Sequence, residues 1–168
     1  MSGEMFPVDL TSRAVALIDR LRARHLMLAT AESCTGGLIA GLITSVSGSS
    51  DVLDCGFVTY SNVAKTRMTG VPAELITAKG AVSEEVARAM AEGALANSAA
   101  DVAVAVTGVA GPGGGTAAKP VGLVHCAVAR KGHRTVHREL RLGDIGREEV
   151  RLETVRVAVE IAYEIAGP

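Results

Sequence analysis

The chain has 168 residues, 48% of them hydrophobic and 21% charged, with a formal net charge of −1 at pH 7. These values are ordinary for a folded domain and exclude a chain that is disordered along its whole length. Because there is no net positive charge, no Trp, and only two Phe and two Tyr, nucleic acid is not expected as a partner. We expect a single domain, residues 1–168, with a core of Ala, Val, Leu and Ile.

Cysteine usage and the N-terminal residues bear on the cellular location. Cys34, Cys55 and Cys126 are widely spaced and form neither a C-x-x-C pair nor a disulfide framework, which favours a reducing compartment. Residues 1–4 are polar and acidic, unlike a signal peptide, and no apolar run approaches the roughly 18 residues typical of a membrane span. We therefore expect a cytoplasmic protein with no membrane partner.

The first part of the chain alternates helices and strands. Apolar residues recur at helical spacing between 14 and 21, which predicts an amphipathic helix that opens near Asp9 or Thr11. The elements predicted after it are a buried strand at 26–30, a turn of small residues at 31–37, a helix at 38–46, a strand at 52–60 and a short helix at 62–68.

The second part adds a helix, three strands and a last helix. Ser83 is a plausible N-cap for a helix that runs to about residue 96. The elements predicted after it are a buried strand at 101–107, a glycine-rich loop at 108–116, a hairpin of strands 121–129 and 135–142, and a helix at 147–165. This order predicts an α/β fold, a three-layer α/β/α domain with a mixed sheet.

Ser33 is the first candidate for chemistry. It lies where a strand leads into a helix through a turn that contains Gly36 and Gly37. In α/β folds such turns lie at the carboxyl edge of the sheet, where ligands bind, and the first N–H groups of the helix can receive an oxyanion or a phosphate. The alternative is that Ser33 or Thr35 only caps the helix.

Cys34 is a rival nucleophile beside Ser33. A thiol needs a base such as His to raise its thiolate fraction, and the nearest histidine in the sequence is His25. The sequence does not place His25 next to Cys34, and a buried structural thiol is the simpler interpretation. A thiol amidase that uses Cys34 remains the alternative within the enzyme class.

The loop at 108–115 is the second candidate. Five of its eight residues are glycine, so its backbone can approach a ligand closely and direct several N–H groups at an anion. The loop matches neither the Walker pattern nor G-x-G-x-x-G before a helix. A flexible surface loop would have a similar composition.

Other polar residues have weaker signals. Lys65 on the short helix is either a general base for a serine or an ordinary surface charge. His125, His133 and His137 lie in the predicted hairpin without supporting carboxylates, so no metal site is expected. The basic residues between 130 and 141 are expected to form a solvated face.

Several segments together resemble one known family. They are residues 31–37, residues 56–62 with Lys65, residues 80–85, and residues 105–122. In this order they resemble the CinA C-terminal domain family, whose characterised members include nicotinamide mononucleotide deamidases. The resemblance covers nearly the whole chain, from Leu17 to the final helix.

The resemblance implies a serine amidohydrolase of pyridine nucleotide salvage, with Ser33 as nucleophile and Lys65 as its base. It implies no metal and no organic cofactor, a homodimer, and a stand-alone form without the larger N-terminal domain of many relatives. The family's usual Gly-Asp-Arg run is interrupted here, so either Arg147 or Arg151 could face the nucleotide. The implied substrate-binding residues are Thr35, Gly36, Gly37, Tyr60, Thr107, Gly108, Gly111, Gly113, Arg147 and Arg151.

Two alternatives of other classes stay open. Domains of this family also occur as parts of larger proteins, so a non-catalytic nucleotide-binding module is one of them. The other is an accessory protein of DNA uptake or damage response, which the family name suggests and the near-neutral charge disfavours.

Overall fold

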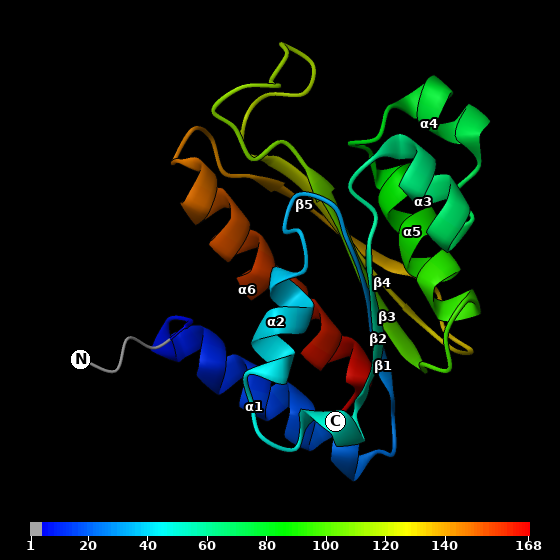
Figure 1. The fold of residues 1–168 in the computed structure, drawn as a ribbon, viewed down its shortest axis with the longest axis vertical. Helices are drawn as coiled ribbons and strands as arrows, with labels where there is room; N and C mark the ends of the chain where they lie inside the picture. Colours follow the sequence, from blue (N-terminus) through cyan, green and yellow to red (C-terminus); the bar gives the residue numbers. More distant parts are fainter. Residues whose placement is uncertain (1–4) are drawn as a thin grey trace.

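A five-stranded mixed sheet forms the middle layer of the computed structural model, which describes residues 5–168 (Figure 1). Its order is β2-β1-β3-β4-β5, with β1 parallel to β2 and β3, and β4 antiparallel to β3 and β5. The mixed α/β fold predicted from the sequence is therefore confirmed. The strands are β1 (Leu28–Glu32), β2 (Leu53–Val58), β3 (Val102–Gly108), β4 (Leu123–Arg130) and β5 (Val136–Arg141).

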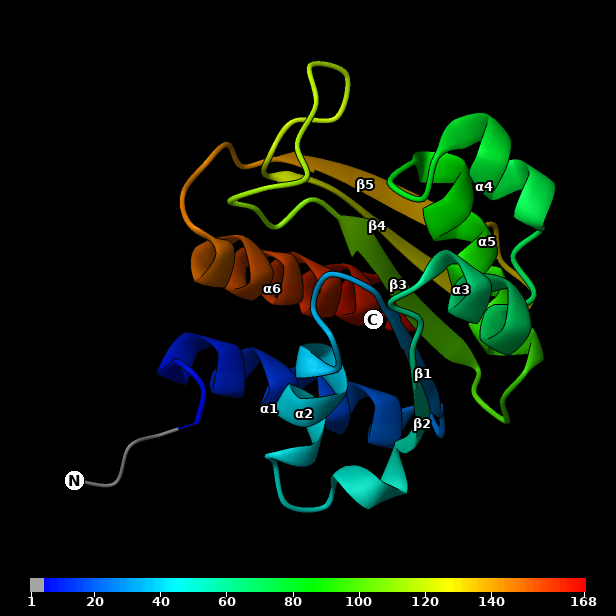
Figure 2. The same ribbon diagram turned by 45° about the horizontal axis from the view of Figure 1, so that its top comes forward.

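Helices cover both faces of the sheet (Figures 1 and 2). One layer contains α1 (Val8–Ala23), α2 (Leu38–Thr44) and α6 (Arg147–Ala166), which pack against a face of Val and Leu side chains. The other layer contains α3 (Asn62–Thr69), α4 (Ala73–Lys79) and α5 (Glu84–Ala96), and a short 3-10 helix, η1 (Ser49–Asp51), precedes β2.

On the second face of the sheet, the core residues of the central strands β1, β3 and β4 are alanines, and β2 adds Cys55 and Phe57. Strand β3 alternates Val and Ala, so its valines face α6 and its alanines face α5. The same face receives alanines from β1 and β4. Small side chains let a helix approach closely, and at Gly93 of α5 an added Cβ would lie 1.7 Å from the carbonyl oxygen of Thr69 at the end of α3. This contact fixes the position of α3, the helix that carries Lys65.

The predicted elements differ from the structure by one missing α-helix and in several bounds, among them the strand predicted at 26–30, which is β1 at Leu28–Glu32. No helix was predicted between residues 70 and 83, but α4 occupies 73–79 with Pro72 as its N-cap. A proline can end one helix and begin the next. The prediction treats Pro72 only as the end of the preceding helix. The strand predicted at 52–60 ends at Val58, which leaves Thr59 and Tyr60 in the loop before α3.

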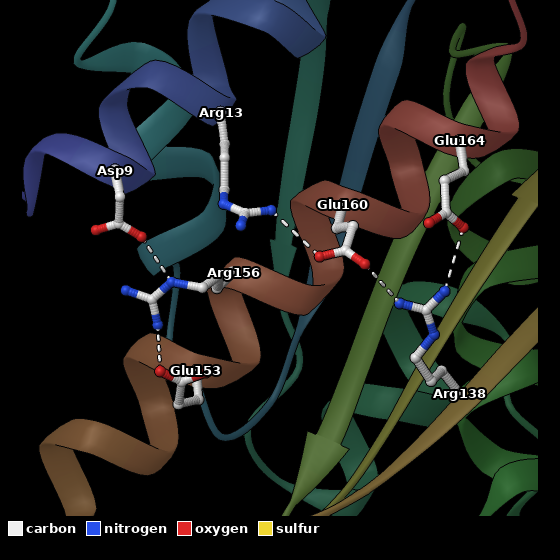
Figure 3. Close-up of polar contacts among 7 residues, drawn as sticks. All are labelled: Asp9, Arg13, Arg138, Glu153, Arg156, Glu160 and Glu164. Carbon is white, nitrogen blue, oxygen red and sulfur yellow. Dashed lines mark hydrogen bonds and ion pairs between the residues drawn. The ribbon is translucent and has the colours of Figure 1, made fainter.

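A network of charged side chains joins α1, α6 and β5 on the outer surface (Figure 3). Glu160 of α6 pairs with Arg13 of α1 and with Arg138 of β5, so part of the predicted basic face is paired with acids. Exposed ion pairs of this kind typically contribute about 0.2–1 kcal/mol each. The other members are Asp9, Glu153, Arg156 and Glu164.

Two expectations concern the termini and membranes. Residues 1–4, which were judged unlike a signal peptide, lie outside the described residues. Between residues 5 and 168, no helix combines the length and apolar character that spanning a bilayer requires.

Candidate active site

Ser33 and Lys65 meet at the carboxyl edge of the sheet. Ser33 follows β1 directly, and Lys65 extends from α3 until its Nζ lies 3.1 Å from Ser33 Oγ. Lys65 Nζ also donates to the carbonyl oxygens of Thr59, at 2.9 Å, and Tyr60, at 3.3 Å. These two carbonyls are available because β2 ends at Val58.

The environment of Lys65 favours the neutral amine. The residue is only 1% exposed, and its hydrogen-bond partners are neutral oxygens. Burial lowers the pKa of Lys65 below its ordinary value. A neutral amine has two N–H donors for the two carbonyls and one lone pair, which is then free to accept the Ser33 proton.

A cavity of about 310 Å³ opens beside this pair. Most of the residues implied by the resemblance line it. They are Ser33, Tyr60, Lys65, Thr107, Gly108, Gly111, Gly113 and Arg147. The structure thus brings together residues from the ends of β1, β2 and β3, from α3 and from the start of α6.

The structure separates the two candidate arginines. Arg147 donates to the carbonyl oxygen of Gly111 at 2.8 Å and to the Tyr60 hydroxyl at 3.3 Å, and it lines the cavity. Arg151 lies one helical turn later and donates to the carbonyl oxygens of Cys34 and Thr35, both at 3.1 Å. Arg147 therefore faces the cavity, and Arg151 supports the turn that carries Ser33 from behind.

Thr35, Gly36 and Gly37 are not brought to the cavity, contrary to the expectation. Thr35 is fully buried and its hydroxyl donates to Glu32. The N–H of Gly36 donates to the carbonyl oxygen of Ser33 within the turn. Both glycines have positive φ, 59° and 101°, so they serve the conformation of the turn.

Two N–H groups at the start of α2 are not available to an oxyanion. The N–H groups of Ile39 and Ala40 both donate to the carboxylate of Glu32, at 2.8 and 3.0 Å. A charged group of the protein itself thus occupies this helix terminus. Donors for a developing negative charge must therefore be other N–H groups, and among the described residues those of Cys34, Thr35 and Gly37 in the turn form no hydrogen bond.

The glycine loop supplies such donors. In this loop, four residues that line the cavity have N–H groups that form no hydrogen bond with any residue from 5 to 168, namely Ala110, Gly111, Gly113 and Gly114. An anion bound there would satisfy them. Thr107, at the end of β3, donates from its hydroxyl to the carbonyl oxygen of Ala81 at 2.8 Å and so holds the opposite wall.

Several lining residues were missed from the sequence. They are Asn62, Ala81 and Val82, whereas Val109, Ala110 and Gly114 belong to the candidate loop at 108–115. Asn62 could have been found, because it precedes Lys65 by three residues on one short helix and therefore lies on the same face. Ala81 and Val82 carry no chemical signal of their own.

Cys34 also borders the cavity, but its environment suppresses the thiolate. The residue is 6% exposed, and burial raises the pKa of the thiol to about 12. Its backbone carbonyl accepts from Arg151. Cys34 is thus packed as a core residue beside Ser33.

Two of the three hairpin histidines contact each other. His125 Nδ1 lies 2.9 Å from His137 Nε2, with the rings stacked, and burial lowers the pKa of both. His133 instead contacts the carbonyl oxygen of Lys131. Over the described part of the chain, no cluster of three or more His, Cys, Asp or Glu is arranged to hold a metal ion.

The sequence profile of the CinA C-terminal domain matches residues 10–166. The chain belongs to this family. In the CinA family, a putative competence-damage inducible protein of Moorella thermoacetica is 48% identical over 143 residues, 85% of this chain and 34% of that protein. A CinA-like protein of Anaeromyxobacter dehalogenans is 53% identical over 146 residues, 86% of this chain and 35% of that protein. The chain spans about a third of the length of these curated relatives.

Solved structures of the CinA family share the fold. Competence/damage inducible protein CihA from Agrobacterium tumefaciens has a TM-score of 0.96 at 53% identity, covering 98% of this chain and 99% of that chain. A CinA superfamily protein from Escherichia coli has a TM-score of 0.87 at 33% identity, covering 97% of this chain and 94% of that chain.

Proposed function

We propose that this protein is a serine amidohydrolase that converts nicotinamide mononucleotide to nicotinate mononucleotide and ammonia. The observation that carries the proposal is the 3.1 Å contact between Ser33 Oγ and the buried Lys65 Nζ at the wall of an open cavity. The choice of substrate rests on the resemblance to characterised deamidases of the CinA family. The proposed reaction rests on the pair formed by Ser33 and Lys65, the dyad.

The first half of the reaction forms an ester on Ser33. Lys65 accepts the Ser33 proton while Oγ attacks the carboxamide carbon, and the tetrahedral intermediate carries its negative charge on the former carbonyl oxygen. Lys65 then gives the proton to the amide nitrogen, the C–N bond breaks and ammonia leaves. A nicotinoyl ester remains on Ser33.

The second half repeats the proton transfer with water. Lys65, neutral again, takes a proton from a water molecule that attacks the ester carbonyl. Collapse of the second intermediate releases the carboxylic acid and returns a proton to Ser33 Oγ. Four proton transfers through one lysine, two in each half of the reaction, therefore complete the cycle without any cofactor in the proposed scheme.

The remaining residues that line the cavity are proposed to bind the negatively charged groups of the substrate and of the intermediate. The free N–H groups of the glycine loop are suited to the oxyanion or the phosphate, and loss of one oxyanion donor typically costs about 3 kcal/mol. Arg147 supplies a positive charge at the same rim. Phosphate binding far from the carboxamide would align the reacting group, so the phosphate-free nucleoside should react slowly.

Other features fit a small-molecule enzyme of a reducing compartment. The cavity, about 310 Å³, is at the lower end of the roughly 300–1,000 Å³ range of small-ligand sites. All three cysteines are free, which agrees with the proposed cytoplasmic location. We propose a homodimer from the family resemblance alone.

The non-catalytic and DNA-related alternatives are separated by one set of assays. Purified protein should release ammonia from nicotinamide mononucleotide, and much less from nicotinamide riboside. Binding of the nucleotide without ammonia release would contradict the proposed enzyme activity and support a non-catalytic binding module. Salt-dependent binding to duplex DNA, with neither nucleotide binding nor ammonia release, would favour a role in DNA uptake or damage response. The names of the competence-damage inducible relatives suggest such a role.

A further inference from the structure

Glu32, the last residue of β1, is a fully buried carboxylate with four hydrogen bonds. Its Oε1 accepts from the hydroxyl of Thr35 at 2.7 Å and from the N–H of Ile39 at 2.8 Å. Its Oε2 accepts from the N–H of Ala40 at 3.0 Å and from the hydroxyl of Thr30 at 3.2 Å. All four donors are neutral groups, so burial of this charge is balanced by hydrogen bonds and the start of α2.

These bonds hold both ends of the segment that carries Ser33. The segment leaves the sheet at Glu32 and becomes helical at Leu38, and the Glu32 carboxylate bonds to residues beyond that point. Because side chains alternate along a strand, Glu32 points to the α2 side of the sheet. Ser33, the next residue, points toward Lys65.

The backbone of Glu32 also reaches Lys65. Its carbonyl oxygen accepts from the N–H of Thr59 at 2.9 Å, and the carbonyl oxygen of Thr59 accepts from Lys65 Nζ at 2.9 Å. Residue 32 is thus bonded by its side chain to the segment that carries the nucleophile and by its backbone to the loop that holds the base. The distance between the two reacting groups depends on this one residue from both sides.

An ordinary helix cap would not require this arrangement. Ser, Thr, Asp or Asn at the N-cap itself satisfies a helix start at little cost, whereas the N-cap of α2 is Gly37, without a side chain. The cap is supplied instead from five residues upstream, across the turn. Compared with an N-cap side chain, capping by Glu32 also makes the turn rigid.

We propose that Glu32 is a positioning residue that holds Ser33 Oγ within hydrogen-bond distance of Lys65 Nζ. The inference rests on the proposed role of Ser33 and Lys65 but not on the identity of the substrate. Glutamine in its place keeps the shape but sets an amide NH₂ against the N–H of Ala40 or Ile39, two donors facing each other. The turn would then shift, and a misplacement of about 1 Å can cost about 100-fold in rate.

The test compares Glu32→Gln with Asp101→Asn as a matched control. Asp101 is a carboxylate at the opposite end of β1, where it accepts from the N–H of Met27 at 2.9 Å. Two rates are measured well below each variant's unfolding temperature: ammonia release from nicotinamide mononucleotide, and labelling of Ser33 by a fluorophosphonate probe. The probe forms an Oγ–P bond with loss of fluoride. Its rate therefore measures how well Lys65 activates Ser33, independently of the natural substrate.

The expected result for Glu32→Gln is a loss of about 100-fold in kcat and in labelling rate, with KM changed less than about threefold. Asp101→Asn should stay within about threefold of wild type in both rates, since it only affects the distant end of the sheet. If Glu32→Gln does not fold, Thr35→Val removes a single donor and should still lower both rates about tenfold, because one hydrogen bond to a charged group is worth roughly 1.5–3 kcal/mol.

Other outcomes distinguish this inference from the proposed function. Wild-type rates in Glu32→Gln, or equal losses in Asp101→Asn, would overturn the positioning role. A wild-type protein that is labelled at Ser33 but inert to nicotinamide mononucleotide would overturn the substrate and leave the role of Glu32 supported by the labelling rates. A wild type inert to both reagents would overturn both proposals.

Discussion

The turn that carries Ser33 and the glycine loop lie at the same edge of the sheet and are both rich in glycine, but they use it differently. In the turn, Gly36 and Gly37 adopt positive φ, the N–H of Gly36 bonds to Ser33, the hydroxyl of Thr35 bonds to Glu32, and the carbonyls of Cys34 and Thr35 bond to Arg151. In the loop, Gly111 and Gly114 also have positive φ, but Gly113 does not, and a Cβ added at Gly113 would have nothing within 4 Å.

This difference separates positioning from binding. A turn that is held by hydrogen bonds to Glu32 and Arg151 has little freedom, which suits a nucleophile that must stay near its base. A loop with free N–H groups has unsatisfied donors that a bound anion can pair with. Changes in the turn should therefore act on kcat, and changes in the loop should act on KM.

The largest effect is expected for Lys65→Ala. Removing the proposed base should lower kcat by about 10²–10⁴-fold. Binding of nicotinamide mononucleotide should change little, because Lys65 bonds to Ser33 and to backbone carbonyls within the protein. Calorimetric titration and ammonia release measure the two quantities, and activity within a few-fold of wild type would remove Lys65 from the mechanism.

The pH profile of the wild type supplies the matching control. The base must be neutral, so kcat should rise with pH through the pKa of Lys65 and level off above it. Since burial lowers that pKa, the midpoint should lie below about 10.4, the value for a free lysine. Lys65→Ala should lose this rise, and a wild-type kcat that is flat from about pH 6 to 9, the range where a base tuned to about 7–8 titrates, would contradict the assignment.

A pair of glycine substitutions tests the comparison directly. Gly37→Ala places a side chain at φ 101°, which costs about 1–2 kcal/mol and should lower both the unfolding temperature and kcat, the latter about tenfold. Gly113→Ala meets open space, so stability should stay within about 0.5 kcal/mol while KM rises. Thermal unfolding and steady-state kinetics separate the two, and the reverse pattern would break the division of roles.

Arg147 and Arg151, both on α6, test the same difference between binding and positioning. Arg147→Ala should raise KM by about tenfold with kcat nearly unchanged, because a hydrogen bond to a charged group is worth roughly 1.5–3 kcal/mol. Arg151→Ala should instead lower stability and kcat, because it loses two bonds to the carbonyls of the turn. Equal effects of both substitutions on KM would mean that Arg151 also reaches the substrate.

Cys34→Ala should have the smallest effect. The thiol is buried and its raised pKa leaves almost no thiolate at neutral pH. We expect kcat within about threefold of wild type and a stability loss of about 1 kcal/mol for the small cavity. A hundredfold loss of kcat would instead favour the thiol mechanism.

Much of the fold could be predicted because its signals are local. The Val and Ala alternation of β3 already indicates a strand buried on two faces, and Ser83 does cap α5. Helix α4 escaped prediction because seven residues after a proline carry too little periodic pattern.

The site was harder to predict because it joins distant segments. Ser33 and Lys65 are 32 residues apart, and only the family resemblance linked them before the structure placed them in contact. Arg147 and Arg151 share one face of α6, so their different targets depend on which loop lies opposite each. The role of Glu32 could not be predicted from the sequence, because it depends on which side of the sheet the side chain faces.

Identification of the covalent intermediate tests the Ser33 mechanism most directly. Protein is quenched in acid during turnover of nicotinamide mononucleotide, digested, and analysed by mass spectrometry for a nicotinoyl adduct on the peptide that contains both Ser33 and Cys34. We predict that the adduct forms in the wild type and in Cys34→Ala and is absent in Ser33→Ala, which should also be inactive while remaining folded. An adduct that persists in Ser33→Ala and disappears in Cys34→Ala would contradict the serine mechanism and identify a thiol enzyme.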